Sequence, residues 1–277
     1  MTTLTVQRPA PGRRRRSHVV ADSLTMLRRN LLHIVRYPGL TMFVIGAPVV
    51  FLLLFVFVFG GTLGAGLPGA DPAAGREAYV AYVMPGILAM TIAGTAGGAA
   101  TTVAMDMTEG ITARFRTMAI SRAAVLAGHV LGNTVQALIG IVVVLGVGLL
   151  VGFRPNAGAA GWVAALGVIV LIAFAISWLA VAMGMQAKTV ETASNQPTLL
   201  ILLPFLGSGF VPTGSMPGWL QWFAQYQPFT PFVETLRGLL LGTPLGWNPV
   251  LAIGWCVVIA AAGYAWSLTI YERTSVR

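Results

Sequence analysis

The feature that most constrains this chain is a series of six apolar blocks, none of which contains an acidic or basic residue. A bilayer core about 30 Å thick needs roughly 20 apolar residues for each helix that crosses it. We therefore predict an all-α, polytopic membrane protein whose transmembrane domain, residues 41–270, has six transmembrane helices. The predicted spans are approximately residues 41–59, 84–105, 130–151, 162–183, 197–211 and 249–270, of which the fifth is short and contains Pro204.

The composition excludes a soluble globular protein. Hydrophobic residues make up 56% of the chain and charged residues only 9%, and the mean hydropathy is +0.81. A typical soluble chain has roughly 25% charged residues. Because this chain has too few charges to cover a surface that faces water, much of its exterior must face lipid.

The basic residues are concentrated in alternate segments between the blocks. Of the 17 basic residues, 14 lie in the N-terminal tail, in residues 106–129, in residues 184–196 or after residue 270. The other segments contain only Arg76, Arg154 and Arg237. By the positive-inside rule, both termini are predicted to be cytoplasmic. We expect a multi-pass protein of the bacterial cell membrane, and no nucleic-acid partner, because the charge flanks the membrane.

The N-terminal 40 residues divide into two parts. Residues 1–16 include four consecutive arginines and are predicted to be a disordered basic tail. Residues 17–40 are predicted to form an amphipathic helix in the inner membrane interface, with a soluble packing helix as the alternative. About forty residues precede the first block, too many for the charged region of a signal peptide, so this block should remain in the protein. The apolar face of the helix consists of Val20, Leu24, Leu27, Leu31 and Ile34.

Residues 106–122, on the predicted cytoplasmic side, combine charges with apolar groups at helical spacing. Ile111, Phe115 and Met118 share one face among several arginines. This pattern suits a short helix that docks in a groove of a partner protein, but it equally fits a solvated, positively charged loop. The candidate docking residues are Asp106, Glu109, Gly110, Arg114, Phe115, Arg116, Ile120 and Arg122.

Residues 207–238 are too apolar for a free loop and too often interrupted by proline and glycine for a straight span. We predict an outer re-entrant hairpin of short helices that dip into the outer leaflet, followed after residue 270 by a cytoplasmic tail, 271–277. Glu234 and Arg237 form an i, i+3 pair that should neutralise itself, with a direct role in substrate binding as the alternative. The candidate gate residues are Phe210, Pro212, Met216, Pro217, Trp219, Pro228, Glu234 and Arg237.

The chain lacks the motifs of self-powered transport and of catalysis. Ion-coupled carriers usually keep ionisable groups inside the membrane, and the six blocks contain none. The phosphate-binding G-x-x-x-x-G-K-[ST] loop is absent, since the only lysine, Lys188, follows an alanine. No H-E-x-x-H motif occurs, and the three histidines fall on or near the predicted cytoplasmic side, away from Ser208. We predict no catalytic or metal site, and we expect Cys256 to be a small buried hydrophobic residue.

Two groups of residues carry a family resemblance. The inner group is Asp106, Gly110, Arg114-Phe115-Arg116, Ile120-Ser121-Arg122 and Gly128, and the outer group is Phe210-Val211-Pro212, Met216-Pro217-Gly218-Trp219-Leu220, Pro228, Thr230 and Leu236-Arg237. With both groups in place in a six-span chain, the sequence resembles the permeases of ABC-2 exporters, most closely the daunorubicin/doxorubicin-resistance type. Ala113 and Ala119 stand where that family more often has Asp and Pro.

The resemblance implies the membrane-spanning permease subunit of an ATP-driven ABC exporter. Such a subunit would pair with a second copy or a sister permease and with two copies of an ATP-binding subunit, which would hold the ATP and Mg²⁺; the permease itself would bind no cofactor. Residues 106–122 would contain the coupling helix. Uncharged, aromatic and methionine-rich spans favour a hydrophobic or amphipathic cargo, such as a drug or a lipid. The alternatives are an ion-coupled multidrug carrier and a non-transporting membrane scaffold.

A glycine cluster in the second predicted span completes the sequence-based expectations. Gly94, Gly97 and Gly98 are expected to permit close approach of another helix, because glycine has no side chain to separate two backbones.

Overall fold

The computed structural model describes residues 38–67, 75–108 and 122–273 of the chain, and these residues contain helices and turns without a strand. The predicted interfacial helix, residues 17–40, falls almost entirely outside them. The elements are α2 (Pro38–Leu54), the π-helical turn η1 (Phe55–Phe59), α3 (Gly60–Ala65), α4 (Gly75–Thr108), α6 (Arg122–Val151), α7 (Ala159–Gln186), α8 (Val190–Asn195), α9 (Thr198–Leu202), the 3-10 turn η3 (Thr213–Ser215), α10 (Gly218–Tyr226), α11 (Phe229–Leu241) and α12 (Asn248–Arg273).

Five helices in the described residues are long and apolar enough to cross a membrane. They cover Val44–Ala65, Gly75–Thr108, Leu126–Val151, Ala159–Gln186 and Asn248–Ile270, and they correspond to five of the six predicted spans. The second span is longer than its apolar block, because Arg76 and Glu77 continue α4 beyond the stretch that hydropathy marks. All five helices lack strong amphipathicity, as expected for segments surrounded by lipid and by other apolar helices.

The prediction of a regular span at residues 197–211 is wrong. Only α9, five residues long, is a regular helix there, and residues 203–211 continue as hydrogen-bonded turns. The break follows from Pro204, which has no N–H to donate to the carbonyl four residues earlier. Beyond it, the amides of Phe205 and Gly207 bond three residues back, to Leu202 and Pro204.

This broken segment nevertheless runs along α4. Ser194 lies beside Gly97, and Gly209 lies beside Gly86, so this part of the chain runs antiparallel to α4. The Tyr79 hydroxyl donates to the Phe210 carbonyl at 3.2 Å. Gly97 and Tyr79 are 18 residues apart on α4, which corresponds to about 27 Å at 1.5 Å per residue. The stretch from Ser194 to Phe210, which contains the end of α8 and the five-residue α9, therefore covers nearly the thickness of a bilayer core without one long helix.

An aromatic cluster supports the broken segment where it reaches η1. Phe205 and Phe210 stack with ring centroids 4.3 Å apart and an interplanar angle of 5°. Phe55 of the π-helical turn packs against Phe210 at 4.8 Å and against Phe205 at 6.2 Å. Aromatic pairs at these separations stabilise a contact beyond the area they bury. The π-helical turn after α2 therefore coincides with the place where Phe55 packs against Phe205 and Phe210.

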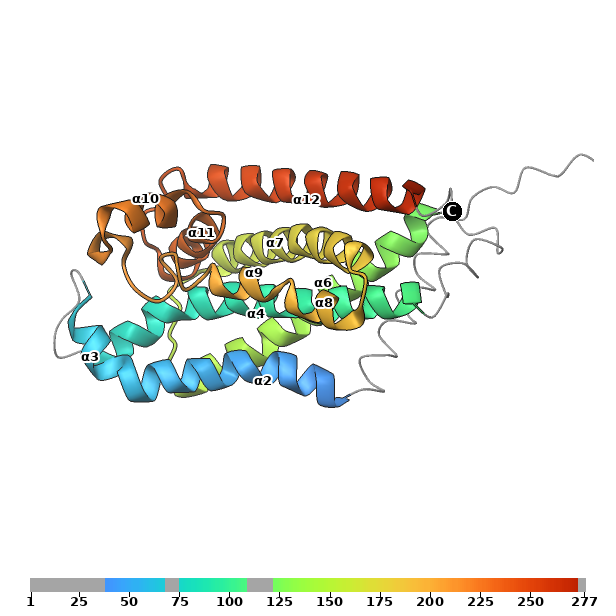
Figure 1. The fold of residues 1–277 in the computed structure, drawn as a ribbon. Coiled ribbons are helices and arrows are strands. Elements are labelled where there is room, and N and C mark those ends of the chain that lie inside the picture. Colours follow the sequence, from blue (N-terminus) through green and yellow to red (C-terminus); the bar gives the residue numbers. More distant parts are fainter. Residues whose placement is uncertain (1–37, 68–74, 109–121, 274–277) are drawn as a thin grey trace, which may run out of the picture.

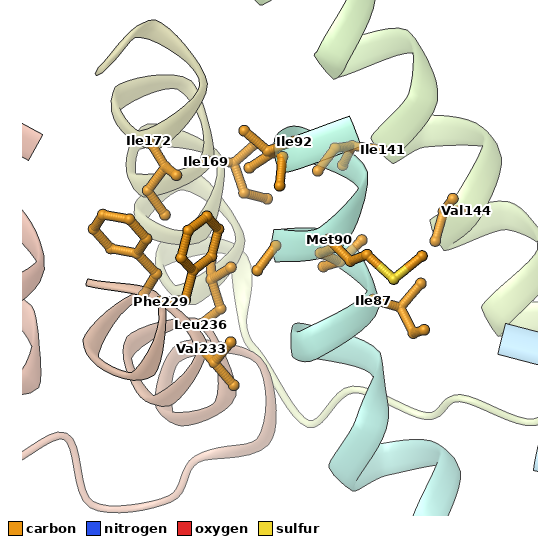
Figure 2. Close-up of a cluster of buried hydrophobic side chains, with 14 of the residues drawn as sticks. Ile87, Met90, Ile92, Ile141, Val144, Ile169, Ile172, Phe229, Val233 and Leu236 are labelled. Carbon is orange, nitrogen blue, oxygen red and sulfur yellow. The ribbon is translucent and has the colours of Figure 1, made fainter. Parts of the chain in front are cut away.

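α4 is the central helix of the bundle, with α2, α6, α7 and α9 around it (Figure 1). Its most apolar 18 residues are 78% buried, compared with 22% for the corresponding stretches of the α2–α3 helix and of α12. In Figure 2, Met90 of α4 points toward Val144 of α6, and Phe229 of α11 lies near Ile172 of α7. The core thus forms around α4, while α2 and α12 present much of their apolar surface outward, as lipid-facing helices do.

The two ends of the bundle differ (Figure 1). At one end, which we name the hairpin end, lie α3, α10 and α11. At the opposite end α2 begins, α4 ends, α6 begins and α12 ends. The first and last described residues of the chain therefore lie at the same end of the molecule.

Candidate functional site

Arg237 lies at the centre of the hairpin end. This residue of α11 is 6% exposed, and its Nη1 pairs with the Glu234 carboxylate. Its Nη2 donates to the carbonyl oxygens of Tyr82 at 3.0 Å and of Ser208 at 2.9 Å. The guanidinium also covers the Tyr82 ring, with Cζ 3.9 Å from the ring centroid. One side chain therefore joins α4, α11 and the broken segment through charge-assisted hydrogen bonds and a cation–π contact.

The local sequence of α4 lets the broken segment approach it closely. Pro85 interrupts the hydrogen bonding of α4, because its ring nitrogen cannot donate to the carbonyl of Ala81. One residue later, Gly86 lets the backbone of Gly209 approach so closely that a Cβ there would lie 2.3 Å from the Gly209 oxygen. The Tyr82 hydroxyl then donates to the Ser208 carbonyl at 3.0 Å. The Pro-Gly pair thus fixes the broken segment against the first turns of α4.

A second set of hydrogen bonds holds the corner between α10 and α11. Thr230 is buried, donates to the Ala224 carbonyl and accepts from the Ser208 amide at 3.3 Å. The Gln227 amide donates to the Leu203 carbonyl at 3.1 Å. These side chains tie the corner to the broken segment.

These contacts form one wall of an open cavity of about 710 Å³ at the hairpin end. We name it the hairpin cavity. The Glu234 side chain is 29% exposed and that of Arg237 is 7% exposed, so the carboxylate is the more accessible of the two charges. The lining residues are Leu67, Ala78, Ala81, Tyr82, Ser208, Pro212, Thr213, Gly214, Glu234, Arg237, Leu241, Thr243 and Pro244.

The structure brings together only some of the predicted gate residues. Pro212, Glu234 and Arg237 line the hairpin cavity. Phe210 is buried behind it in the aromatic cluster, and Pro228 begins α11 as its N-cap residue.

The remaining predicted gate residues lie at the surface and do not line the cavity. Pro217 is the N-cap residue of α10, and Met216 precedes it. Trp219 is 77% exposed, as are Trp222 and Trp247 to a similar degree. Exposed tryptophans at one end of a bundle of apolar helices are typical of an aromatic belt at the membrane–water interface.

The opposite end contains a histidine–aspartate contact between the helices that flank the predicted coupling segment. His129 Nε2 of α6 lies 3.3 Å from Asp106 Oδ2 near the end of α4, and both side chains are 10% exposed. Of the other candidate docking residues, Arg122 begins α6. Glu109, Gly110, Arg114, Phe115, Arg116 and Ile120 lie outside the described residues.

The glycine cluster makes no close helix contact within this chain, so the expected approach of another helix stays a prediction. A Cβ at Gly94 or Gly98 would meet no atom within 4 Å, and one at Gly97 would lie 3.9 Å from the Ser194 oxygen. The close approaches occur instead at Gly86 and at Gly184, where a Cβ would lie 2.5 Å from the Ala100 oxygen. Sequence alone does not separate these positions, because each is a glycine in an apolar helix.

Sequence reasoning also missed Tyr82 and His129. A signal existed for Tyr82, since Tyr79 and Tyr82 share a face just before the second apolar block. Ser208 entered the sequence analysis as a possible nucleophile, but it acts here through its backbone carbonyl. His129 lies at the end opposite Ser208, on α6 beside the end of α4, so the two do not form a catalytic pair.

Titratable groups elsewhere offer no additional centre. Within the described ranges, no cluster of three or more His, Cys, Asp or Glu side chains is arranged to hold a metal ion. Glu191, exposed in the first turn of α8, has its pKa lowered by its own backbone N–H and by the Thr189 hydroxyl, which also caps that helix. Cys256 is buried, as predicted.

Comparisons with known proteins agree with this architecture. Residues 22–241 match the ABC-2 type transporter family. A daunorubicin resistance ABC transporter permease protein, DrrB1 of Streptomyces coeruleorubidus, is 29% identical over 249 residues, which is 89% of this chain and 83% of that protein. A probable doxorubicin resistance ABC transporter permease protein, DrrC of Mycobacterium tuberculosis, is 28% identical over 255 residues, or 87% of each chain. Since the family match spans most of the sequence and five long apolar helices accompany it, this chain belongs to the ABC-2 type transporter family.

Proposed function

We propose that this chain is the membrane permease of an ATP-driven exporter that moves hydrophobic or amphipathic compounds, such as drugs, out of a bacterial cell. The match to the ABC-2 family over residues 22–241 carries this proposal. In that family the permease spans the membrane, and ATP hydrolysis belongs to a separate ATP-binding subunit. The relatives named for daunorubicin and doxorubicin resistance support a drug as the cargo.

In this proposal the hairpin end faces the outside and the opposite end faces the cytoplasm. The chain crosses the membrane six times, five times as long helices and once as the broken segment along α4. Support comes from the distribution of basic residues and from the first and last described residues, which share one end of the bundle (Figure 1). The hairpin of α10 and α11 then enters the outer leaflet from outside, and the exposed tryptophans mark the interface.

The coupling helix is proposed to lie within residues 106–122. Its flanks support this position, because α4 ends at Thr108 and α6 begins at Arg122 at the same end of the bundle. The Asp106–His129 pair would hold these flanks together while the segment docks on the ATPase. Binding of ATP would bring two ATPases together, and the movement would pass through α4 and α6 to the bundle.

A second permease, either another copy or a sister subunit, is proposed to complete the transport path. The open face at Gly94 and Gly98 supports a close helix contact with that subunit, since these glycines meet nothing within their own chain. The same face is half-buried within the single chain, and it belongs to α4, the helix that ends just before the coupling segment. An export path between two permeases would then be bordered by the helix that receives the ATPase movement.

Co-purification with an ATP-binding subunit tests this proposal. The permease would be solubilised in mild detergent from a host that also expresses the neighbouring ATPase gene. We expect the ATPase to co-purify with the wild-type chain and to be lost when Arg114 and Arg116 are both changed to Glu. Arg154→Glu, a matched charge reversal at the hairpin end, is the control and should retain it. A folded, dimeric wild-type chain that captures no ATPase would contradict the proposal.

A further inference from the structure

We propose that the hairpin cavity binds the ammonium group of amphipathic organic cations, with the Glu234 carboxylate as its principal acceptor. The inference specifies that the cargo is positively charged. It rests on the proposed function, because the cavity is an exit site only if the chain is an exporter. The cavity, about 710 Å³, has the size of a site for a drug-sized ligand. Its walls contain apolar groups from Leu67, Ala78 and Leu241 together with a few polar groups, the usual combination in ligand sites.

The arrangement of the Glu234–Arg237 pair decides the sign of the ligand charge. Arg237 has one face against the Tyr82 ring, one nitrogen on Glu234 and another on the carbonyls of Tyr82 and Ser208. Its remaining nitrogen, Nε, has no hydrogen-bond partner in the described residues, but it is buried, so a ligand in the cavity does not reach it. An anion entering the cavity would therefore find few donors of the guanidinium available. Nη1 and Nη2 already hold Glu234 and the carbonyls of Tyr82 and Ser208.

Glu234 presents the opposite situation. Arg237 bonds to Oε1, and within the described residues no hydrogen bond reaches Oε2. The side chain is 29% exposed at the cavity. An ionised carboxylate has about four lone-pair positions, so Glu234 retains the capacity to accept from a ligand while it stays paired with Arg237.

The break in α4 adds an acceptor to the same wall. Because Pro85 has no N–H, the Ala81 carbonyl does not receive the hydrogen bond that a helix would supply. Ala81 lines the cavity, and so does Thr213, whose hydroxyl can accept as well as donate. An ammonium group has three donors and no acceptor, so it fits a wall of one carboxylate and neutral oxygens.

Dye binding to the purified permease, without its ATPase, tests the inference. The probe is dansylcadaverine, a fluorescent amphiphile with a primary ammonium, and its matched neutral form is the N-acetyl derivative. Wild-type protein in detergent should bind the ammonium dye about tenfold or more tightly than the acetylated dye, as a charge-assisted hydrogen bond to a carboxylate would give. Glu234→Gln should abolish this preference, whereas Glu77→Gln, which removes an exposed carboxylate on α4 outside the cavity lining, should preserve it.

A second variant covers the case in which Glu234→Gln fails to fold. Ala78→Phe fills the cavity from α4 and leaves the Glu234–Arg237 pair intact, so it should weaken binding of both dyes. Equal affinity of the wild-type protein for the two dyes would overturn the inference, as would wild-type affinity for the ammonium dye in folded Ala78→Phe. Because the dye assay contains no ATPase, it can be interpreted even if the co-purification experiment fails. The two proposals can therefore fail separately.

Discussion

Arg237 stands where α4, α11 and the broken segment meet, and its contacts reach each of them. Tyr82 comes from α4, Glu234 from α11 and Ser208 from the segment. The sequence predicted the pair with Glu234, because side chains that are three residues apart on a helix are neighbours. It did not predict the contact with Tyr82, which lies 155 residues away and receives Arg237 through a backbone carbonyl that has no sequence signature. The packing role of Arg237 therefore became visible only in the fold.

Replacing Arg237 by Ala should destabilise the hairpin end. The substitution removes the donor that pairs with the Glu234 carboxylate, a donor of the Tyr82 carbonyl, and one of the two donors of the Ser208 carbonyl, which keeps the Tyr82 hydroxyl. We expect this to cost about 2–4 kcal/mol after allowing for the partial exposure of Glu234. The melting temperature in detergent should fall by roughly 5–10 °C. Arg76→Ala, which removes an exposed arginine 5.6 Å from the Phe57 ring, should change it by much less. Equal melting temperatures for Arg237→Ala and wild type would contradict the proposed packing role.

Gly86 and Gly94 should respond in opposite ways to the same added methyl group. Gly86→Ala places a Cβ against the backbone of Gly209, which cannot yield as a flexible side chain would, so we expect a loss of roughly 1–3 kcal/mol. Gly94→Ala meets no atom within its chain, so it should leave the monomer as stable as wild type or slightly more stable, because Ala favours a helix. Thermal unfolding of both variants in detergent is the measurement. Similar losses in the two variants would contradict the difference in packing.

The long helices were the most predictable elements, because a membrane-spanning helix can be recognised in a sequence from its length and apolarity alone. The blocks at 130–151 and 162–183 lie within α6 and α7 with a few residues added at the start or end. The block at 197–211 had the same apolarity but formed a broken path, since Pro204 interrupts it and Phe205 and Phe210 pack against η1. Apolarity therefore predicts that a segment is buried in membrane or protein, whereas its regularity depends on the partners it meets.

At the same scale, the Asp106–His129 pair should control how movement passes between α4 and α6. His129→Ala removes one partner of a mostly buried carboxylate at the flank of the coupling segment. We expect ATP-driven export into inside-out vesicles to fall at least several-fold. His129→Gln should retain most of the activity, because the glutamine amide nitrogen can donate near the position of Nε2. Equal export by His129→Ala and wild type would exclude a coupling role for the pair.

Considered as a whole, the described part of the molecule has the start of α2 and the end of α12 at one end and the tryptophan-bearing helix α10 at the other (Figure 1). In the sequence, most basic residues fall before α2, between α4 and α6, or after α12. A soluble protein has no reason to separate charge in this way, but a membrane protein inserted by the positive-inside rule does. The broken segment matters for this polarity. If it did not cross the membrane, five helices would leave the two ends of the chain on opposite sides, although the fold holds the start of α2 and the end of α12 together.

Single-cysteine labelling in intact cells decides between these arrangements. The native Cys256 is buried and would be replaced by Ala to give a silent background. Ser215→Cys, in the exposed turn η3, should react from outside with a membrane-impermeant maleimide. Ser17→Cys and Ser275→Cys should react only after the membrane is permeabilised, because the proposed six crossings would return both tails to the cytoplasm. Labelling of one tail but not the other in intact cells would mean that the broken segment does not cross, and labelling of both tails with protection of residue 215 would reverse the orientation.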